Sequence, residues 1–250
     1  MTDVLLIDGD ILAYQVCTAA MREVEIDGEV TYSLNRDEAR SRFKAKIDYW
    51  LEELDCVRPL LAWSHREERF RDDLDENYKG NRTGKKPLGY WALVETWMDE
   101  WPSRCIAGLE GDDVLGILQT RPDGPSTICL SEDKDLKTIP GLHSKMNDLG
   151  VFEVTLEEAD TWWMVQTLAG DRTDGYKGCP GVGEVTAARL LEPQKGDLPA
   201  MWEIVLRTYE DKGLTYQDAL RNAQMARILR HEDYPDAYPW CPSALIQGVK

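Results

Sequence analysis

Short apolar runs that end in acidic residues constrain the fold of this chain more than any other feature. Residues 4–7 are continuously apolar and are followed at once by Asp8, and the stretch 126–130, which ends in the apolar Ile-Cys-Leu, is followed by Asp133 and Asp135. A short run without alternation is typical of a strand buried on both faces, which occurs in parallel sheets. Because the carboxyl ends of parallel strands share one edge, these runs predict an α/β fold with acidic groups at that edge.

Composition narrows the class of protein. A chain of 250 residues forms one large or two small domains. The net charge of −17 argues against binding nucleic acid through bulk positive charge. Six scattered cysteines and three histidines form no zinc pattern, so we expect reduced thiols and a cytoplasmic protein. No apolar run is long enough to predict a membrane span, and the acidic N-terminus does not resemble a signal peptide.

Another acidic pair lies in a glycine-rich turn of a predicted helix-turn-helix over residues 156–192. Asp171 and Asp174 follow its first helix, and Gly181 and Gly183 precede its second. Glycines before a helix let backbone N–H groups approach a phosphate, which the helix N-terminus also favours. Carboxylates repel phosphate unless a divalent cation lies between them. This stretch therefore suggests a metal that handles a phosphodiester, although a capped surface loop has the same composition.

A fourth acidic cluster opens a predicted helix. Glu110, Asp112 and Asp113 stand within four residues, where mutual repulsion is costly unless a cation compensates it. The clusters around Asp8, Glu110, Asp133 and Asp171 would together supply about eight oxygen ligands if they converge. Such a set suits two hard cations about 3.5–4 Å apart, the arrangement used for in-line phosphoryl displacement.

Residues 78–86 are the most basic short stretch of this acidic chain. They contain one aromatic residue, two glycines and no acid, together with the cations Lys79, Arg82, Lys85 and Lys86. This composition predicts a flexible segment that follows a phosphate backbone.

Other patterns predict the surrounding elements. The turn signal Asp27-Gly28 predicts a hairpin over 22–34. Asn35 and Glu38 resemble a capping box that opens a helix to about residue 54. Apolar periodicity predicts further helices, over residues 88–101, 198–211 and 216–230.

These motifs, in this order, resemble the 5′-nuclease (flap endonuclease) superfamily. The resemblance is carried by Ile7-Asp8-Gly9, Tyr78-Lys79-Gly80-Asn81-Arg82, Glu110-Gly111-Asp112-Asp113, Asp133-Lys134-Asp135, Asp171 with Asp174, and Gly181-Val182-Gly183. Within the superfamily, Lys137-Thr138-Ile139-Pro140 and Asp160-Thr161-Trp162-Trp163 are similar to the T-odd phage exonucleases.

The resemblance implies a fold and an activity. The fold is a PIN-like (Rossmann-like), mainly parallel α/β nuclease domain over 1–154, with a basic arch at about 70–90, followed by a helical DNA-binding region over 155–250. The helix–three-turn–helix over 156–192 often binds K⁺. The implied activity is 5′→3′ exonuclease cleavage of duplex DNA ends, RNA–DNA hybrids and flaps by a two-metal mechanism with Mg²⁺ or Mn²⁺. A phage-encoded enzyme of replication and recombination would act in the host cytoplasm.

The resemblance also implies roles for individual residues. The metal ligands would be Asp8, Glu110, Asp112, Asp113, Asp133, Asp135, Asp171 and Asp174. The catalytic residues would be Asp8, Lys79, Arg82, Asp112, Asp113 and Asp133. Contacts with nucleic acid are expected from Tyr78, Lys79, Arg82, Lys85, Lys86, Gly181 and Gly183.

One position departs from the family pattern. The family usually has an aspartate after the second strand, predicted here over 58–63, and His65 fits that position when counted back from Tyr78. Imidazole is a poorer ligand for Mg²⁺ than carboxylate. Asp10 either joins the site or only caps the next helix.

Two other readings are open. Asp8 and Asp10 fit the nucleophile motif of a haloacid-dehalogenase-type phosphatase, although that class does not explain the basic stretch 78–86 or the helix-turn-helix. A DNA-binding relative without catalysis is the second alternative, which His65 makes conceivable.

Overall fold

The buried runs form the centre of a six-stranded sheet. The computed structural model describes residues 2–26, 29–81, 86–235 and 239–242. The strand order is β5-β4-β1-β6-β7-β8. The strands are β1 (Thr2–Asp8), β4 (Cys56–Trp63), β5 (Ser103–Cys105), β6 (Thr127–Leu130), β7 (Gly141–Lys145) and β8 (Asp148–Val154). All neighbours are parallel except β7 and β8, so the predicted α/β fold with a mainly parallel sheet is confirmed.

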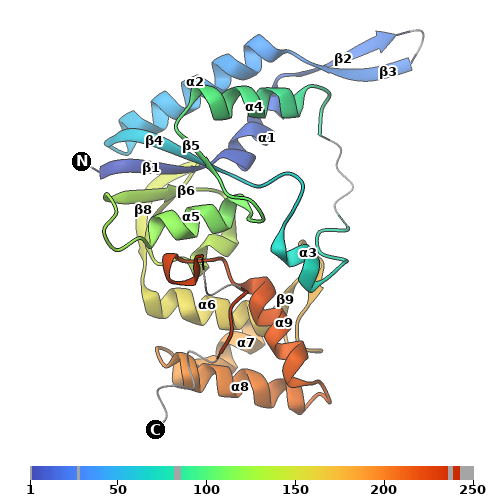
Figure 1. The fold of residues 1–250 in the computed structure, drawn as a ribbon, viewed down its shortest axis with the longest axis vertical. Coiled ribbons are helices and arrows are strands. Elements are labelled where there is room, and N and C mark those ends of the chain that lie inside the picture. The colour runs from blue at the N-terminus through green and yellow to red at the C-terminus, as the bar shows by residue number, and fades with distance from the viewer. Residues whose placement is uncertain (1, 27–28, 82–85, 236–238, 243–250) are drawn as a thin grey trace.

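Helices cover both faces of the sheet, which explains why its central strands are continuously apolar. Leu5 and Ile7 of β1 join the core on one face, and Val4 and Leu6 join the core on the other. The first face is covered by α1 (Gly9–Ala19), α2 (Arg36–Glu53) and α4 (Tyr90–Glu100), and the second by α5 (Gly111–Gln119) and the short η1 (Lys134–Thr138). Figure 1 shows α2 and α4 above the sheet and α5 below it.

The order of the strands reverses at β1. The chain moves from β1 outward to β4 and β5, and then returns to the other side of β1 to form β6 and β7. Ligands of open α/β sheets bind outside the carboxyl ends of the strands at such a reversal. The topology therefore places the end of β1, with Asp8, beside the segment after β6, with Asp133.

The predicted hairpin and its following helix are both present. β2 (Met21–Ile26) pairs antiparallel with β3 (Glu29–Leu34), and Figure 1 shows this hairpin extending beyond the end of α2. The turn Asp27-Gly28 lies outside the described residues. Asn35 caps α2 by accepting a 3.1 Å hydrogen bond from the Glu38 backbone N–H.

The second half of the chain forms a helical body below the sheet (Figure 1). Its elements are α6 (Leu156–Ala169), β9 (Gly170–Asp171), β10 (Tyr176–Lys177), α7 (Glu184–Leu191), η2 (Glu192–Gln194), α8 (Leu198–Glu210) and α9 (Tyr216–Ala226). The backbones of Gly170 and Gly178 cross so closely that a Cβ on Gly170 would lie 2.1 Å from the Gly178 nitrogen. Glycine is therefore required at this crossing. No helix among the described residues is long and apolar enough to cross a lipid bilayer.

The predicted end of the last long helix is wrong. We expected a helix to residue 230, but α9 ends at Ala226, and residues 227–230 form an extended segment, which we call the strap. The strap leads to η3 (His231–Asp233) and inserts Ile228 and Leu229 into the core beneath α5. Apolar periodicity does not reveal this change, because these two side chains are buried in either conformation.

The strap packs against α5 at Gly116, which gives a stability prediction. A Cβ on Gly116 would lie 2.2 Å from the Leu229 carbonyl oxygen, so Gly116→Ala must displace backbone. We expect a loss of about 1–3 kcal/mol of unfolding free energy, as for other overpacked cores. Urea denaturation measures it. Gly150→Ala is the control, since its Cβ would have its nearest neighbour at 3.6 Å, and an equal loss there would contradict the prediction.

Candidate active site

Asp8 lies at the carboxyl end of β1, at the centre of the acidic edge. Its Oδ1 accepts a 2.9 Å hydrogen bond from the Ile11 backbone N–H, which caps α1, and its Oδ2 accepts a 2.8 Å bond from the Ser131 hydroxyl. Burial, followed by the charge of Asp10, raises the pKa of Asp8 to about 7. Asp8 is thus fixed in place but carries a charge that its surroundings disfavour.

Three further acids face the same region from α5 and η1. Burial and the charges of Asp133 and Asp8 raise the pKa of Asp112 well above its usual value. Burial and the charges of Asp133 and Asp171 raise the pKa of Asp135 to about 7. We call Asp8, Asp112, Asp133 and Asp135 the repelling acids, because the charge of Asp133 is among those that oppose the ionisation of the other three.

The remaining predicted ligands have basic or hydrogen-bonding partners. Glu110 accepts hydrogen bonds from Lys79 Nζ (2.5 Å), the Tyr78 hydroxyl (2.7 Å) and Arg71 Nη1 (3.0 Å). Burial opposes ionisation of Glu110, but Lys79 and Arg71 outweigh it and lower its pKa to about 2. Glu110 is therefore ionised and held at the start of α5.

Asp113 is fully buried, and both of its carboxylate oxygens have partners. Oδ2 accepts from Arg71 Nη1 at 2.7 Å and from the Glu110 backbone N–H at 3.2 Å. Oδ1 accepts from Arg71 Nη2 at 2.8 Å and from the Leu229 backbone N–H at 3.1 Å. The structure thus gives Asp113 a partner set unlike that of Asp112, its neighbour in sequence.

Asp171 is the last residue of β9, and Asp174 lies in the turn between β9 and β10. Asp171 accepts from the Thr173 backbone N–H at 2.6 Å and pairs with Lys134 at 3.2 Å. Although burial opposes it, these two partners lower the pKa of Asp171. Asp174 accepts from the Tyr78 hydroxyl at 3.2 Å, and its carbonyl accepts from the Lys79 backbone N–H at 2.8 Å. The turn therefore joins the helical body to the base of the basic segment.

The basic segment turns partly inward. Lys79 reaches Glu110, while Lys86 lies over the rings of Tyr14 and Tyr90 at 4.5 and 4.7 Å. Arg82 and Lys85 lie outside the described residues, so their predicted contacts stay predictions.

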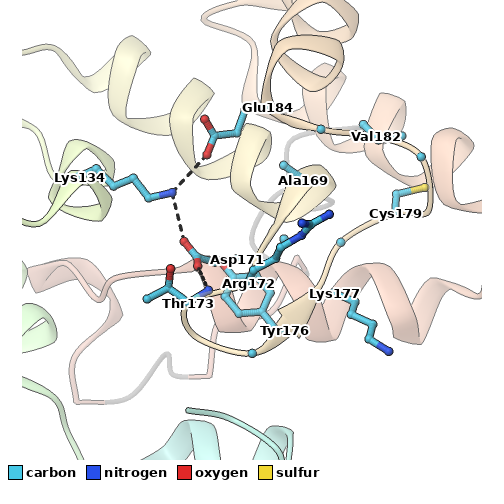
Figure 2. A pocket seen from close by; sticks show the side chains of 15 residues that line it. Lys134, Ala169, Asp171, Arg172, Thr173, Tyr176, Lys177, Cys179, Val182 and Glu184 are labelled. Atoms are coloured by element: carbon cyan, nitrogen blue, oxygen red, sulfur yellow. Dashed lines mark hydrogen bonds and ion pairs between the residues drawn. The ribbon is translucent and has the colours of Figure 1, made fainter. Parts of the chain in front are cut away.

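Gly181 and Gly183 line a cleft of about 660 Å³ in the helical body. The cleft is lined by residues 169–173, 175–179 and 181–184 and reaches the N-terminus of α7. Arg172 and Lys177 among them are exposed. Figure 2 shows Lys134 reaching from η1 to both Asp171 and Glu184, which ties this cleft to the acidic edge. Backbone N–H groups before a helix are suited to phosphate.

The repelling acids fit divalent cations by the chemistry of their donors. Buried or partly buried carboxylates whose charges oppose one another are stabilised by a hard cation, which prefers oxygen ligands. Across the described part of the chain, no three or more acidic, histidine or cysteine side chains are already arranged to hold a metal ion. Arg71 holds both carboxylate oxygens of Asp113, whereas Asp112 lies beside Asp8 and Asp133.

Sequence reasoning missed the roles of Arg71 and Ser64. Immediately after β4, the Ser64 hydroxyl accepts from the Gly111 N–H at 2.9 Å, and the Ser64 N–H donates to Asp10 at 2.9 Å. The ring of His65 instead contacts the Glu68 carbonyl at 3.3 Å. Because successive side chains of an extended segment alternate in direction, the side chain that faces the acids is Ser64 and not His65. Asp10 accepts from the Ser64 N–H, and the residue that caps α1 is Asp8.

Comparison with known proteins agrees with this architecture. No family model matches the chain. The chain is 29% identical to the exodeoxyribonuclease of Enterobacteria phage T3 over 285 residues, covering 96% of this chain and 93% of that protein. It is also 29% identical to the exonuclease of Escherichia phage T7, with the same coverage. A solved structure of the bacteriophage T5 flap endonuclease, in a complex with DNA and metal ions, has a TM-score of 0.62 and 13% identity, covering 90% of this chain and 88% of that chain.

The mainly parallel sheet with its attached helical body has the same fold as the T5 flap endonuclease structure. The two phage exonucleases match the chain over almost its whole length, so the chain is similar to the 5′-nuclease (flap endonuclease) superfamily.

Proposed function

We propose that this protein is a divalent-metal-dependent 5′→3′ exonuclease that hydrolyses phosphodiester bonds from the 5′ ends of duplex DNA. We extend the proposal to RNA in RNA–DNA hybrids and to 5′ flaps, and to a role in phage DNA replication and recombination. One observation carries it: the repelling acids lie at the carboxyl edge of the sheet, next to a glycine-lined cleft suited to phosphate.

The proposed chemistry divides the work between two groups of residues. Asp8, Asp112, Asp133 and Asp135 would hold Mg²⁺ or Mn²⁺, two ions in the arrangement we favour. Such ions lower the pKa of an attacking water and stabilise the leaving 3′ oxygen. Lys79 supplies positive charge at the same edge, where its Nζ lies 2.5 Å from Glu110 and 3.7 Å from Asp174. We assign it to the scissile phosphate.

The helical body would hold the duplex without reading its sequence. Backbone N–H groups of the turn before α7 and the exposed Arg172 and Lys177 are suited to phosphates rather than base edges. K⁺ in this turn stays a prediction, which a K⁺ titration of DNA affinity at constant ionic strength tests.

Lys177→Ala is expected to weaken binding of duplex DNA and to reduce the salt dependence of that binding by about one unit of slope, the effect of losing one phosphate contact. Fluorescence anisotropy over a range of salt concentrations, with Ca²⁺ replacing Mg²⁺, measures both quantities. Lys44→Ala is the control, because Lys44 is also an exposed lysine, lies on α2 and does not line the cleft. Equal losses in the two variants would contradict the assignment of the cleft to DNA.

Digestion of linear duplex DNA tests the proposed polarity. The substrate carries a label at the 5′ or the 3′ end, and wild-type protein is compared with Asp133→Ala in Mg²⁺ or Mn²⁺. We expect early release of the 5′ label as mono- or short oligonucleotides, lost in Asp133→Ala. Intact DNA at every ion tried would overturn the proposal. Bound but uncut DNA would then favour a non-catalytic relative, and hydrolysis of a small phosphomonoester would favour a phosphatase.

A further inference from the structure

We propose that Arg71 is a positioning residue for the nuclease reaction. It clamps the first turn of α5 on both sides of Asp112 and thereby sets the orientation of Glu110 relative to the helical body. This inference rests on the proposed function. Arg71 lies in the short helix α3 (Phe70–Leu74), just before the basic segment, and is only 3% exposed.

Every N–H donor of the Arg71 side chain has an acceptor. Nη1 donates to Glu110 at 3.0 Å and to Asp113 at 2.7 Å, and Nη2 donates to Asp113 at 2.8 Å. The remaining donors, Nε and the second N–H of Nη2, bond the carbonyls of Met225 (3.1 Å) and Arg227 (2.5 Å). A guanidinium has five donors in a planar fork, so lysine cannot make the same set.

The acidic partners of Arg71 bracket a proposed metal ligand. Glu110 is the N-cap of α5, and Asp113 completes a capping box with it, so Asp112 lies in the turn between two residues held by Arg71. Asp112 lies beside Asp8 and Asp133, and Arg71 bonds the residues on either side of it, Glu110 and Asp113. Arg71 therefore fixes the helical turn that presents Asp112 without contacting the repelling acids itself.

The carbonyl partners of Arg71 belong to the end of α9 and to the strap. The last carbonyls of a helix lack hydrogen-bond donors within the helix, and here Arg71 donates to two of them. α9 is fixed to α6 by the Trp163 indole N–H, which donates to the Ala223 carbonyl at 2.9 Å. α6 leads directly to Asp171. Arg71 is thus a direct physical link between the DNA-binding body and the catalytic edge.

Arg71→Lys tests this role, with Arg69→Lys as its control. Arg69 lies two residues away and forms a partly exposed ion pair with Asp72. We expect Arg71→Lys to lower kcat at least about tenfold per folded molecule, with nearly unchanged duplex affinity in Ca²⁺, and Arg69→Lys to leave kcat within about twofold. A purely structural role would lower the melting temperature but not kcat of the folded fraction.

A double-mutant cycle with Glu110→Gln shows whether Arg71 acts through the first turn of α5. We expect the two losses in kcat to be non-additive, so that the double variant is little worse than the poorer single variant. Independent, fully additive losses would overturn the inference while leaving the proposed function intact. A wild-type protein that cuts no DNA would instead overturn the proposed function, and this inference with it.

Gly116→Ala perturbs the same hydrogen-bond network through the strap. It is the test variant to use if Arg71→Lys does not fold. It displaces the backbone next to the Leu229 N–H, which donates to Asp113. The inference predicts a lower kcat that is again non-additive with Glu110→Gln. An unchanged kcat in folded Gly116→Ala, or a loss that adds fully to that of Glu110→Gln, would reject the coupling.

Discussion

Asp112→Asn is expected to abolish 5′ cleavage and, at the same time, to make the metal-free protein more stable. The charge of Asp112 is opposed by burial and by Asp133 and Asp8, so removing that charge relieves repulsion in the folded state. Asparagine keeps the size of the side chain but loses a charged ligand. We expect kcat to fall about a thousandfold or more, since metal positioning contributes several kcal/mol to the transition state.

Two measurements check the Asp112 prediction. Single-turnover release of a 5′ label gives the loss of kcat. Urea denaturation in a chelator near pH 8 is expected to show a gain of about 1 kcal/mol in unfolding free energy, because residues kept for function are often not those that stabilise the fold most. Added Mg²⁺ should then stabilise wild-type protein more than Asp112→Asn. A variant that is less stable than wild-type protein in chelator would contradict the assignment of Asp112 to the repelling acids.

Asp113→Asn is expected to have the opposite profile, with a large loss of folding stability. Asp113 is fully buried and accepts from both terminal nitrogens of Arg71, so the change leaves a buried guanidinium without its carboxylate. Breaking a buried ion pair by removing one partner costs about 3–5 kcal/mol. Urea denaturation in chelator measures the loss, and Asp112→Asn is the matched neighbour.

The outcome for Asp113 decides between two roles. If Asp113→Asn is destabilised and its folded fraction binds Mn²⁺ like wild-type protein, Asp113 is structural. If its unfolding free energy stays within about 1 kcal/mol of wild type while metal binding is lost, the motif-based expectation of a metal ligand holds instead.

The sequence was sufficient for the sheet and for the identity of the acidic edge. The stretches at residues 4–7 and 126–130 predict buried strands, because a short stretch of consecutive apolar residues is a local sign of a strand buried on both faces. Parallel topology then brings the acids after those strands to one edge without any knowledge of side-chain contacts. The capping pair Thr155 and Glu158 likewise marks the start of α6 through bonds within four residues.

The division of the acids into two groups could not be predicted in this way. Glu110, Asp112 and Asp113 are alike in sequence, but their hydrogen-bond partners differ because Arg71 and the strap approach them from distant parts of the chain. Arg71 also bonds carbonyls at the end of α9, which stops at Ala226 and not at residue 230. Ser64, and not His65, faces the acids, because successive side chains after β4 point in opposite directions. Counting residues back from Tyr78 does not distinguish these two positions.

Binding of Mn²⁺ by the repelling acids, measured beside 5′ cleavage on one preparation, tests the central claim most directly. Electron paramagnetic resonance counts bound Mn²⁺ in wild-type protein, Asp112→Asn and Arg69→Lys, and release of a 5′ label is followed over the same Mn²⁺ concentrations. We expect wild-type protein and Arg69→Lys to bind Mn²⁺ and to release the 5′ label in parallel, and Asp112→Asn to lose both. Cleavage that continues in excess chelator, or Mn²⁺ binding that Asp112→Asn leaves unchanged, would contradict the account.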